Sequence, residues 1–233
     1  MGKKQIEAVA DWLFNNNYEH FGLEKARTHE AFARFEEHLP ALWESSAPRL
    51  APLYTAAGPL EALIGLGHRA RAGKDTCADR LVNRHGYHRD AFARPLKVMC
   101  QALFGWGDEH LNGHLKEVVD ADWGFSPRTA LQRLGTECVR NLVGPQVWVK
   151  SMQLRWSGKL VITDVRFPDE AELVRSAGGQ LWRIDRPGLL PSTHPSETAL
   201  LDYQEWDRVL RNDSTIDALD KQVDQLIYLR GGR

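Results

Sequence analysis

The chain has 233 residues, of which 42% are hydrophobic, 9% aromatic and 26% charged. At about 150 residues per domain, this length favours one large domain, or one domain with an extension. The composition is typical of a globular protein with a sizeable core, and it excludes disordered, collagen-like and disulfide-scaffold classes. Because the formal charge is -1, no global field attracts the protein to DNA or to an anionic membrane. Any anion-binding site must therefore be local.

The sequence shows neither the pattern of a membrane span nor that of a signal peptide. No apolar run reaches the roughly 18 residues that a membrane span needs, and the first residues lack the apolar core of a signal peptide. We therefore expect a cytoplasmic protein without a membrane partner. The cysteines Cys77, Cys100 and Cys138 lie far apart and form no CxxC pair, so we expect reduced, mostly buried thiols.

Residues 1–57 have the apolar periodicity of amphipathic helices, and Gly58 and Pro59 mark their end. We expect a helical extension there whose apolar faces pack on the remaining chain or on a second copy, so that a homodimer is left open. Residues 60–233 form the main domain, in which short apolar runs alternate with helical periodicities. This pattern predicts an α/β fold with a parallel sheet flanked by helices.

The expected elements follow in chain order. Strands are predicted at residues 62–67, 87–92, 160–165, 180–185 and 208–211. Helices are predicted at residues 74–84, 95–104, 127–142, 145–155, 168–176 and 215–229.

The segment ALIGLGHRARAGKDTCADRLV passes from an apolar strand through a loop into an amphipathic helix, with Gly73 and Lys74 at the turn. Such a turn binds phosphate because backbone N–H groups and the helix dipole converge on the anion while the lysine contacts its oxygens. The usual first glycine is replaced by His68, and Asp75 stands where Ser or Thr is common, so Thr76 would supply the hydroxyl near magnesium. The predicted nucleotide-binding residues are Arg69, Arg71, Ala72, Gly73, Lys74, Asp75 and Thr76.

Local charge supports this interpretation. Between Leu66 and Lys97 there are eight Lys or Arg and three Asp, a surplus of five positive charges. The alternative is an ordinary Gly-Lys helix start after a buried strand. In either case we expect Lys74 to be an exposed loop lysine that contributes little to the core.

Asp164 stands at the end of an apolar run in LVITDVRFPDEAELV, where a strand leaving the core would expose its carboxylate beside the phosphate loop. A carboxylate there can hold magnesium directly or through water. Arg166 follows two residues later and points to the same side if the strand continues. The alternative is a buried structural Asp-Arg pair.

The helix PRTALQRLGTECVRNLVG carries Arg128, Gln132, Glu137 and Arg140, which on a regular helix drift slowly around one side. Such a stripe could bind the phosphate and base edge of a nucleotide, and the alternative is a solvated helix face.

Farther on, RPGLLPSTHPSETAL is long, Pro-rich and polar, which suits a mobile lid. Within it, His194, Ser196 and Glu197 could touch substrate, or Ser196 could cap a local turn.

Taken together, these blocks resemble the phage deoxynucleoside monophosphate kinases of the adenylate-kinase-like P-loop group. The matching segments are IGLGHRARAGKDTCADRL, FARPLK with SPRTALQRLGTECVRNLVGPQVWV, VITDVRFPDEAELVRSAGGQLWRIDRP, and HPSETAL with WDRVLRND. The resemblance covers roughly residues 60–229 and leaves residues 1–57 outside. It implies a P-loop nucleoside monophosphate kinase fold with a five-stranded parallel sheet, ATP and Mg²⁺ as the donor system, a deoxynucleoside 5'-monophosphate as acceptor, and the host cytoplasm as location.

The resemblance also implies roles for individual residues. Lys74, Asp164 and Arg166 would be catalytic, and Thr76 with Asp164 would hold the metal. The residues that would face the acceptor are Lys97, Arg128, Gln132, Glu137 and Arg140. His68 departs from the glycine that is usual in these kinases.

Two other functions are compatible with the same residues. One is a P-loop kinase that phosphorylates a hydroxymethylated base in DNA, with Asp164 as the base that activates the hydroxyl. It would need a long basic track, whereas the visible charge surplus is compact. The other is a nucleotide-binding module whose kinase activity has lapsed, for which His68 is the only support.

Overall fold

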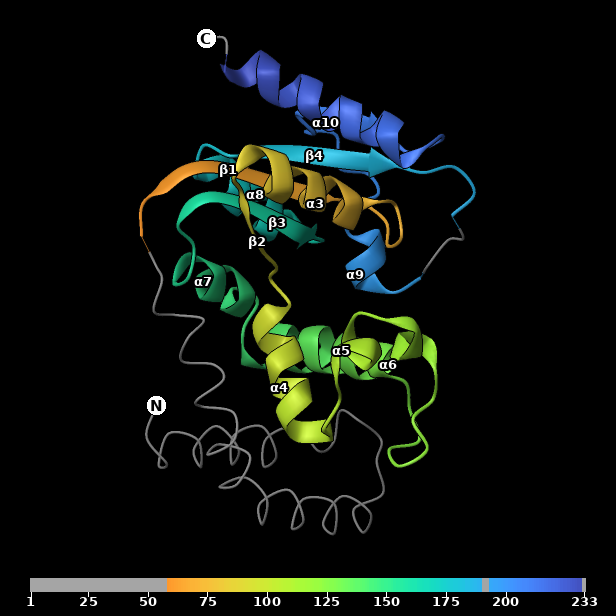
Figure 1. The fold of residues 1–233 in the computed structure, drawn as a ribbon. Helices are drawn as coiled ribbons and strands as arrows, with labels where there is room; N and C mark the ends of the chain where they lie inside the picture. Colours follow the sequence, from red (N-terminus) through yellow and green to blue (C-terminus); the bar gives the residue numbers. More distant parts are fainter. Residues whose placement is uncertain (1–57, 190–192, 232–233) are drawn as a thin grey trace. The chain divides into compact units, whose positions relative to one another are not determined.

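A computed structural model of the chain describes residues 58–189 and 193–231 (Figure 1). The described residues divide into two compact units. Residues 98–145 form the helical unit, and residues 58–97, 146–189 and 193–231 form the sheet unit. The expected helical extension at 1–57 lies outside the described residues, so it stays a prediction.

The sheet unit is built on one five-stranded parallel sheet of order β2-β3-β1-β4-β5. Its strands are β1 (Leu60–Gly67), β2 (His88–Asp90), β3 (Gly158–Val165), β4 (Gln180–Asp185) and β5 (Arg208–Arg211). The predicted α/β fold with a parallel five-stranded sheet is confirmed. The sequence placed β4 and β5 at the observed bounds, whereas β2 is shorter than predicted.

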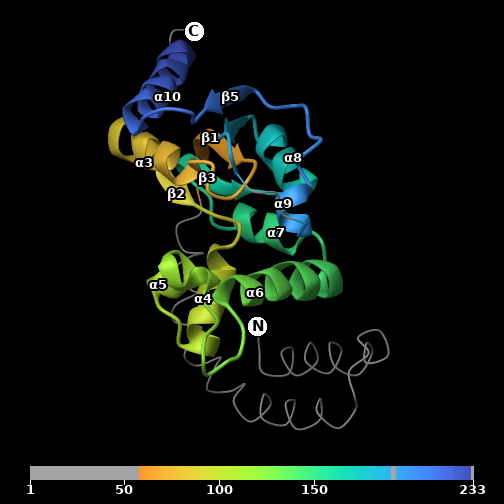
Figure 2. The same ribbon diagram turned by 90° about the vertical axis from the view of Figure 1, so that its right-hand side faces the viewer.

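Both faces of β1 are buried, which explains its nearly continuous apolar sequence. Ile64 and Leu66 belong to the core cluster that includes residues of α3 (Lys74–His85) and α10 (Ile216–Gly231). The opposite face packs on α8 (Pro168–Ser176), where a Cβ at Gly65 would lie 3.0 Å from the side chain of Val174. Figure 2 shows the sheet between these two layers.

Two shorter helices complete the sheet unit, α7 (Val147–Gln153) and α9 (Pro195–Thr198). The helix α4 (Arg94–Phe104) begins in the sheet unit and ends in the helical unit. The helical unit also contains α5 (Asp108–Leu111), the 3-10 helix η3 (His114–Glu117), α6 (Pro127–Gln132) and η4 (Arg133–Val143).

The segment predicted as one regular helix over 127–142 changes its geometry at Arg133. Ser126 caps α6 by accepting a hydrogen bond from the backbone N–H of Thr129, and η4 then continues as a π-helix. In a π-helix each backbone N–H bonds to the carbonyl five residues earlier, whereas in an α-helix the carbonyl is four residues earlier. Side chains therefore point in different directions from those on an α-helix.

An aromatic cluster packs around Phe104 in the helical unit. The Phe104 ring lies 4.3 Å from that of Trp106 and 5.1 Å from that of Trp123, measured between centroids. Nε1 of Trp106 donates to Asp120 at 2.7 Å, so its polar atom is satisfied.

Two further expectations concern the whole chain. The described cysteines are free, with Cys77 and Cys100 buried and Cys138 half-buried, as expected for structural thiols. Among the described residues, no helix is both long and apolar enough to cross a membrane.

Candidate active site

The loop between β1 and α3 contains several residues in the left-handed backbone region. The φ angles are 84° at His68, 61° at Arg71 and 109° at Gly73. Gly73 is required for a second reason, because a Cβ there would lie 2.5 Å from the amide nitrogen of Asn212. The loop therefore turns tightly just before the first residue of α3, as a phosphate-binding loop does.

Packing against Trp206 explains why glycine stands at position 67, one residue before its usual place in the motif. A Cβ at Gly67 would lie 2.4 Å from the indole of Trp206, so this position is fixed by close approach and not by the loop itself. His68 then occupies the position where glycine is usual, and its left-handed conformation is tolerated more readily by His than by β-branched residues. Its Nδ1 lies 3.2 Å from Oδ1 of Asp185. Burial, with Arg183 nearby, lowers the pKa of His68.

Lys74 is buried, with 7% of its surface exposed, so the expectation of an exposed loop lysine is wrong. The loop curls over the first turn of α3, and Nζ of Lys74 donates to the backbone carbonyls of His68, at 3.1 Å, and Arg69. Burial, together with the positive charge of Arg166, lowers the pKa of Lys74 to about 8. The ammonium is thus aimed at the inside of the loop, where an anion would be bound.

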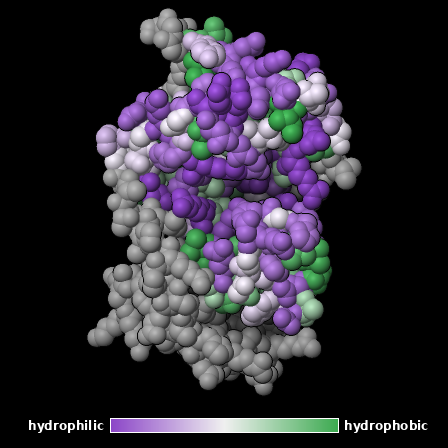
Figure 3. Space-filling view, in the orientation of Figure 1, coloured by the Kyte–Doolittle hydropathy of each residue, from purple (hydrophilic) through white to green (hydrophobic). Residues whose placement is uncertain are grey.

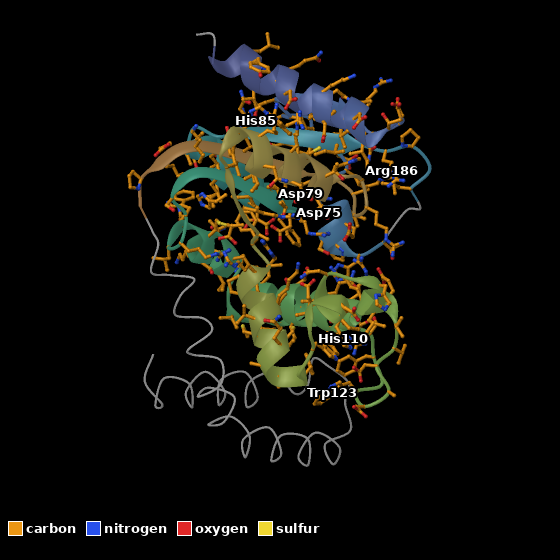
Figure 4. The ribbon with its side chains drawn as sticks, viewed as in Figure 1. Asp75, Asp79, His85, His110, Trp123 and Arg186 are labelled. Carbon is orange, nitrogen blue, oxygen red and sulfur yellow. The ribbon has the colours of Figure 1, made fainter. Side chains whose placement is uncertain are left out.

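The other residues predicted to bind nucleotide have different surroundings. Arg69 and Arg71 belong to the loop, and the carbonyl of Arg71 accepts a hydrogen bond from Arg186 at 3.3 Å. Asp75 is exposed and forms an ion pair with Arg89, which also bonds Asp79 at 3.1 Å. Figure 4 shows Asp75 and Asp79 close together on α3, and Figure 3 shows that hydrophilic residues cover most of this face of the sheet unit.

The carboxylate of Asp164 lies at the end of β3, as predicted, but it also has a structural role. One oxygen accepts a hydrogen bond from the backbone N–H of Phe92 at 2.7 Å, and the other from that of Ala93 at 2.9 Å. Asp164 therefore ties the end of β3 to the segment that follows β2. Its bonding partners are backbone groups, so it does not form the hydrogen-bonded pair with Arg166 that was the alternative interpretation.

A buried ion pair fixes the segment that Asp164 contacts. Nε of Arg155 lies 2.9 Å from Oδ2 of Asp90, and its Nη2 donates to the carbonyl of Ala91 at 2.6 Å. Arg155 also donates to Ser151 at 2.8 Å, so much of the donor capacity of the buried guanidinium is used. Sequence reasoning missed this pair, because a single charged residue at the end of a short helix gives no signal of its partner.

Magnesium is the metal that the resemblance implies. The protein oxygens present could bind it only together with phosphate oxygens of a nucleotide and water. Mg²⁺ in kinases is held by one or two protein oxygens together with substrate phosphates and water. Thr76 is half-buried in the first turn of α3, and each oxygen of Asp164 has a second lone pair. Among the described residues, no group of three His, Cys, Asp or Glu could hold a metal by itself.

Arg166 lies just beyond β3 and contacts α9. Its Nη1 donates to the backbone carbonyl of Ser196 at 3.1 Å and forms an ion pair with Glu197. Burial acts to lower the pKa of Arg166, but the carboxylates of Glu197 and Asp164 outweigh it and raise that pKa. Of the residues expected in the lid, His194 rather than Ser196 caps α9, since its Nδ1 accepts the backbone N–H of Ser196 at 3.2 Å.

The residues expected to face the acceptor belong to the helical unit, except Lys97, which is half-buried on α4. Arg128 on α6 pairs with Glu117 of η3. In the π-helix, Glu137 is exposed while Arg140 is buried, with 8% of its surface exposed. The expectation that these side chains share one side of a regular helix is therefore wrong in part.

A parallel sheet of order β2-β3-β1-β4-β5, with a Gly-Lys loop between β1 and α3, defines a P-loop nucleotide kinase. A family model described as deoxynucleotide monophosphate kinase matches residues 107–223. A putative deoxynucleotide monophosphate kinase of Acanthamoeba polyphaga mimivirus is 36% identical over an alignment of 180 positions that covers 69% of this chain and 93% of that protein. The chain belongs to the deoxynucleotide monophosphate kinase family.

Phage proteins show shorter similarities. The deoxynucleotide monophosphate kinase of Escherichia phage RB69 is 28% identical over 110 residues, covering 44% of this chain and 45% of that protein. The deoxynucleoside-5'-monophosphate kinase of Escherichia phage T5 is 40% identical over 77 residues, covering 31% of this chain and 29% of that protein. These matches span less than half of each phage protein.

Proposed function

We propose that the protein transfers the γ-phosphate of ATP to a deoxynucleoside 5'-monophosphate, giving a deoxynucleoside diphosphate and ADP. The observation that carries this proposal is the loop of the sheet unit, in which the Lys74 ammonium is held against two loop carbonyls. Family membership and the printed names of the mimivirus and phage relatives support the acceptor class.

The donor half of the reaction is assigned to the sheet unit. Lys74 exchanges its loop carbonyls for phosphate oxygens of ATP, and the backbone around Gly73 surrounds the same phosphates. Thr76 and Asp164 would hold Mg²⁺, whose charge neutralises the β and γ phosphates. The whole predicted set at residues 69 and 71–76 is proposed as the donor site.

Arg166 is assigned to the transferring phosphoryl group. Its guanidinium is a permanent cation with a planar fork of donors, which suits a phosphate that passes from one oxygen to another. No general base is assigned, because a monophosphate acceptor is already an anionic nucleophile at neutral pH. Catalysis then depends on holding two nucleotides in line and on neutralising charge.

The acceptor is assigned to Lys97 and to the residues of α6 and η4. Arg128 and Arg140 offer bidentate donors to a phosphate, whereas Gln132 and Glu137 offer the amide and carboxylate that recognise base edges. Arg140 is the residue whose substitution we expect to weaken acceptor binding more than ATP binding.

The two other functions are less well supported. The relatives are named for nucleotide substrates. The charge surplus of the loop region is confined to residues 66–97, which suits one phosphate group better than a DNA strand. A lapsed kinase rested on His68, yet the loop keeps its turn with His68 in the left-handed region.

The direct test is an assay of each deoxynucleoside monophosphate with ATP and Mg²⁺, with the diphosphate products separated by chromatography. We expect saturation with free monophosphate, no product from Lys74→Ala, and a higher KM for the acceptor in Arg140→Ala. Duplex DNA with hydroxymethylated bases serves as the competing acceptor. Phosphorylation of that DNA without turnover of free monophosphates would replace this function with the DNA-kinase alternative.

The domain division is also a proposal: residues 1–57 form an extension and residues 60–233 the kinase domain. If the extension packs through its apolar faces on this domain or on a second copy, a chain that starts near Pro59 loses stability or changes its oligomeric state. Light scattering and thermal unfolding of the full and shortened chains distinguish these outcomes. Unchanged mass, melting temperature and solubility would contradict the proposal.

A further inference from the structure

Glu197 joins the phosphate loop to the arginine beyond β3. Its Oε2 accepts a hydrogen bond from the backbone N–H of Ala70 at 3.1 Å, while its Oε1 pairs with Nη1 of Arg166. The Glu197 side chain is only 6% exposed. One buried carboxylate therefore bridges two parts of the site that are 96 positions apart in sequence.

The short helix α9 holds this carboxylate in place. His194 caps the helix, and its Nδ1 lies 2.9 Å from Oγ of Ser196. Oγ1 of Thr198 donates back to the carbonyl of His194 at 3.3 Å. The carbonyl of Ser196 then adds a second acceptor for Arg166, so α9 presents a carbonyl and a carboxylate to the same guanidinium.

Charge makes this arrangement strong. Burial acts to raise the pKa of Glu197, but Arg166, Ala70 and Lys74 outweigh it and lower that pKa, so the carboxylate is ionised at neutral pH. Charge-assisted hydrogen bonds of a buried carboxylate are stronger than neutral ones. The Arg166 side chain is 25% exposed and that of Glu197 only 6%, so removing Arg166 would leave a mostly buried carboxylate uncompensated.

We propose that Glu197 is a positioning residue for phosphoryl transfer, which holds the guanidinium of Arg166 and the Ala70 segment of the phosphate loop in a fixed mutual arrangement. The proposal rests on the function assigned above to Arg166. Glu197 touches neither nucleotide in this scheme, and it acts by orienting the cation that stabilises the transferring group.

The opposite interpretation is that Glu197 occupies the place of a nucleotide phosphate and must leave when ATP binds. The two ideas predict effects on different quantities. A residue that orients Arg166 affects kcat, because the arginine acts in the transition state. A residue that competes with phosphate weakens ATP binding, so its removal lowers the dissociation constant for ATP.

The test compares Glu197→Gln, Glu197→Asp and Glu197→Ala in the full chain. For each variant, kcat and both KM values are measured, and ATP binding is followed by calorimetry. We expect kcat of Glu197→Gln to fall about tenfold to hundredfold, as for a catalytic group displaced by about 1 Å. We expect KM for ATP and for the acceptor to change less than about threefold, and Glu197→Asp to recover part of the kcat that Glu197→Ala loses.

Two controls separate positioning from a general loss of structure. Glu205 pairs with Arg175 on the surface, 3.6 Å apart, and Glu205→Gln is expected to keep normal kinetics. In an Arg166→Ala background, Glu197→Gln should lower kcat no further, since its effect passes through the arginine. If Glu197→Gln does not fold, as judged by its melting curve, the same comparison is made with Glu197→Asp.

Each outcome decides a different question. Normal kcat in a folded Glu197→Gln protein, tighter ATP binding, or an added loss in the Arg166→Ala background would overturn the positioning role. If Arg166→Ala keeps full kcat, or wild type forms no diphosphate, the proposed function fails first and is recognised as such. A loss of kcat in Arg166→Ala with a normal Glu197→Gln refutes only the inference about Glu197.

Discussion

The side-chain amide of Asn212 donates a 2.8 Å hydrogen bond to the backbone carbonyl of Ala72, although the two residues are 140 positions apart. The backbone N–H of Asn212 is in turn bonded to the carbonyl of Asp185 at 2.7 Å, at the end of β4. Asn212 therefore fixes the last turn of the phosphate loop to the carboxyl end of the sheet. Gly73, directly after Ala72, has no room for a side chain because this amide fills the space.

We predict that Asn212→Ala weakens ATP binding. Without the amide, the carbonyl of Ala72 loses its donor and the loop loses its anchor, so KM for ATP should rise by roughly tenfold, the equivalent of about 1.4 kcal/mol for one hydrogen bond. KM for the acceptor should stay within about twofold. The matched control is Asn112→Ala, which removes an exposed asparagine bonded to Asp108. Equal KM values for ATP in both variants would remove the anchoring role.

The conformation of His68 gives a second prediction. Its φ of 84° lies in the left-handed region, which Asn adopts readily and Val does not. His68→Asn should therefore keep the ATP KM within about twofold, whereas His68→Val should be destabilised by roughly 1–3 kcal/mol and bind ATP less well. Urea unfolding and steady-state kinetics of the two variants test this. Similar behaviour of both variants would show that the loop relaxes at this position.

Sequence patterns located the elements that have clear periodicity or caps. The bounds of α8 were predicted correctly, because a proline starts this helix and apolar residues repeat along it. The short helices α5, η3 and α9 were missed, since each has four residues and none gives a measurable period. The π-helix was missed as well, because its extra residue per turn follows from backbone hydrogen bonding and not from the apolar pattern.

The candidate site could be predicted as a set of residues but not as a set of contacts. Lys74 and Asp164 were identified from their places after apolar runs. The contacts of Lys74 with the loop carbonyls depend on the loop conformation, which no motif predicts. The hydrogen bonds of Asp164 come from the backbone after β2, which is distant in sequence. The pairing of Glu197 with Arg166 is of the same kind.

A third prediction concerns Asp164, whose two oxygens accept backbone N–H groups. In Asp164→Asn, an amide NH₂ replaces one acceptor and faces a donor, which should destabilise the fold by about 1–3 kcal/mol. The same variant should need more Mg²⁺ for half-maximal rate, if Asp164 also holds the metal. Denaturation and a Mg²⁺ titration give the two readouts, and exposed Asp202→Asn is the control. An unchanged Mg²⁺ requirement with lower stability would limit Asp164 to its structural role.

A fourth prediction concerns acid stability. Hydrogen bonds from Arg80 and His85 hold the pKa of Asp224 well below its ordinary value of 3.8. Because the folded-state pKa is lower, this group stabilises the fold above about pH 4, and its contribution is lost as the pH falls below that value.

Asp224→Asn should therefore lower the melting temperature at pH 7 by at most roughly 2–4 °C, as expected for a partly exposed ion pair in a chain of this size. The difference from wild type should persist down to about pH 4 and shrink only in stronger acid. Asp79→Asn, at an exposed pair on α3 rather than on α10, is the control and should have almost no effect. A difference that disappears well above pH 4 would contradict the role of the Asp224 carboxylate.

The last prediction uses the pKa of Lys74, which burial lowers to about 8 from an ordinary value of 10.5. Between these two values the unfolded chain binds more protons than the folded one, so this group makes the nucleotide-free protein more stable as the pH rises through that window. Bound phosphates act in the opposite direction, because their negative charge favours the ammonium and raises its pKa. ATP binding at pH 8.5 should therefore take up part of a proton, and ATP affinity should fall as the pH rises above about 8.

Calorimetry in buffers of different ionisation enthalpy measures this proton uptake directly. Lys74→Arg keeps the charge but does not titrate in this range, so uptake should vanish in that variant. Equal uptake in both proteins would place the titrating group elsewhere and leave Lys74 charged throughout.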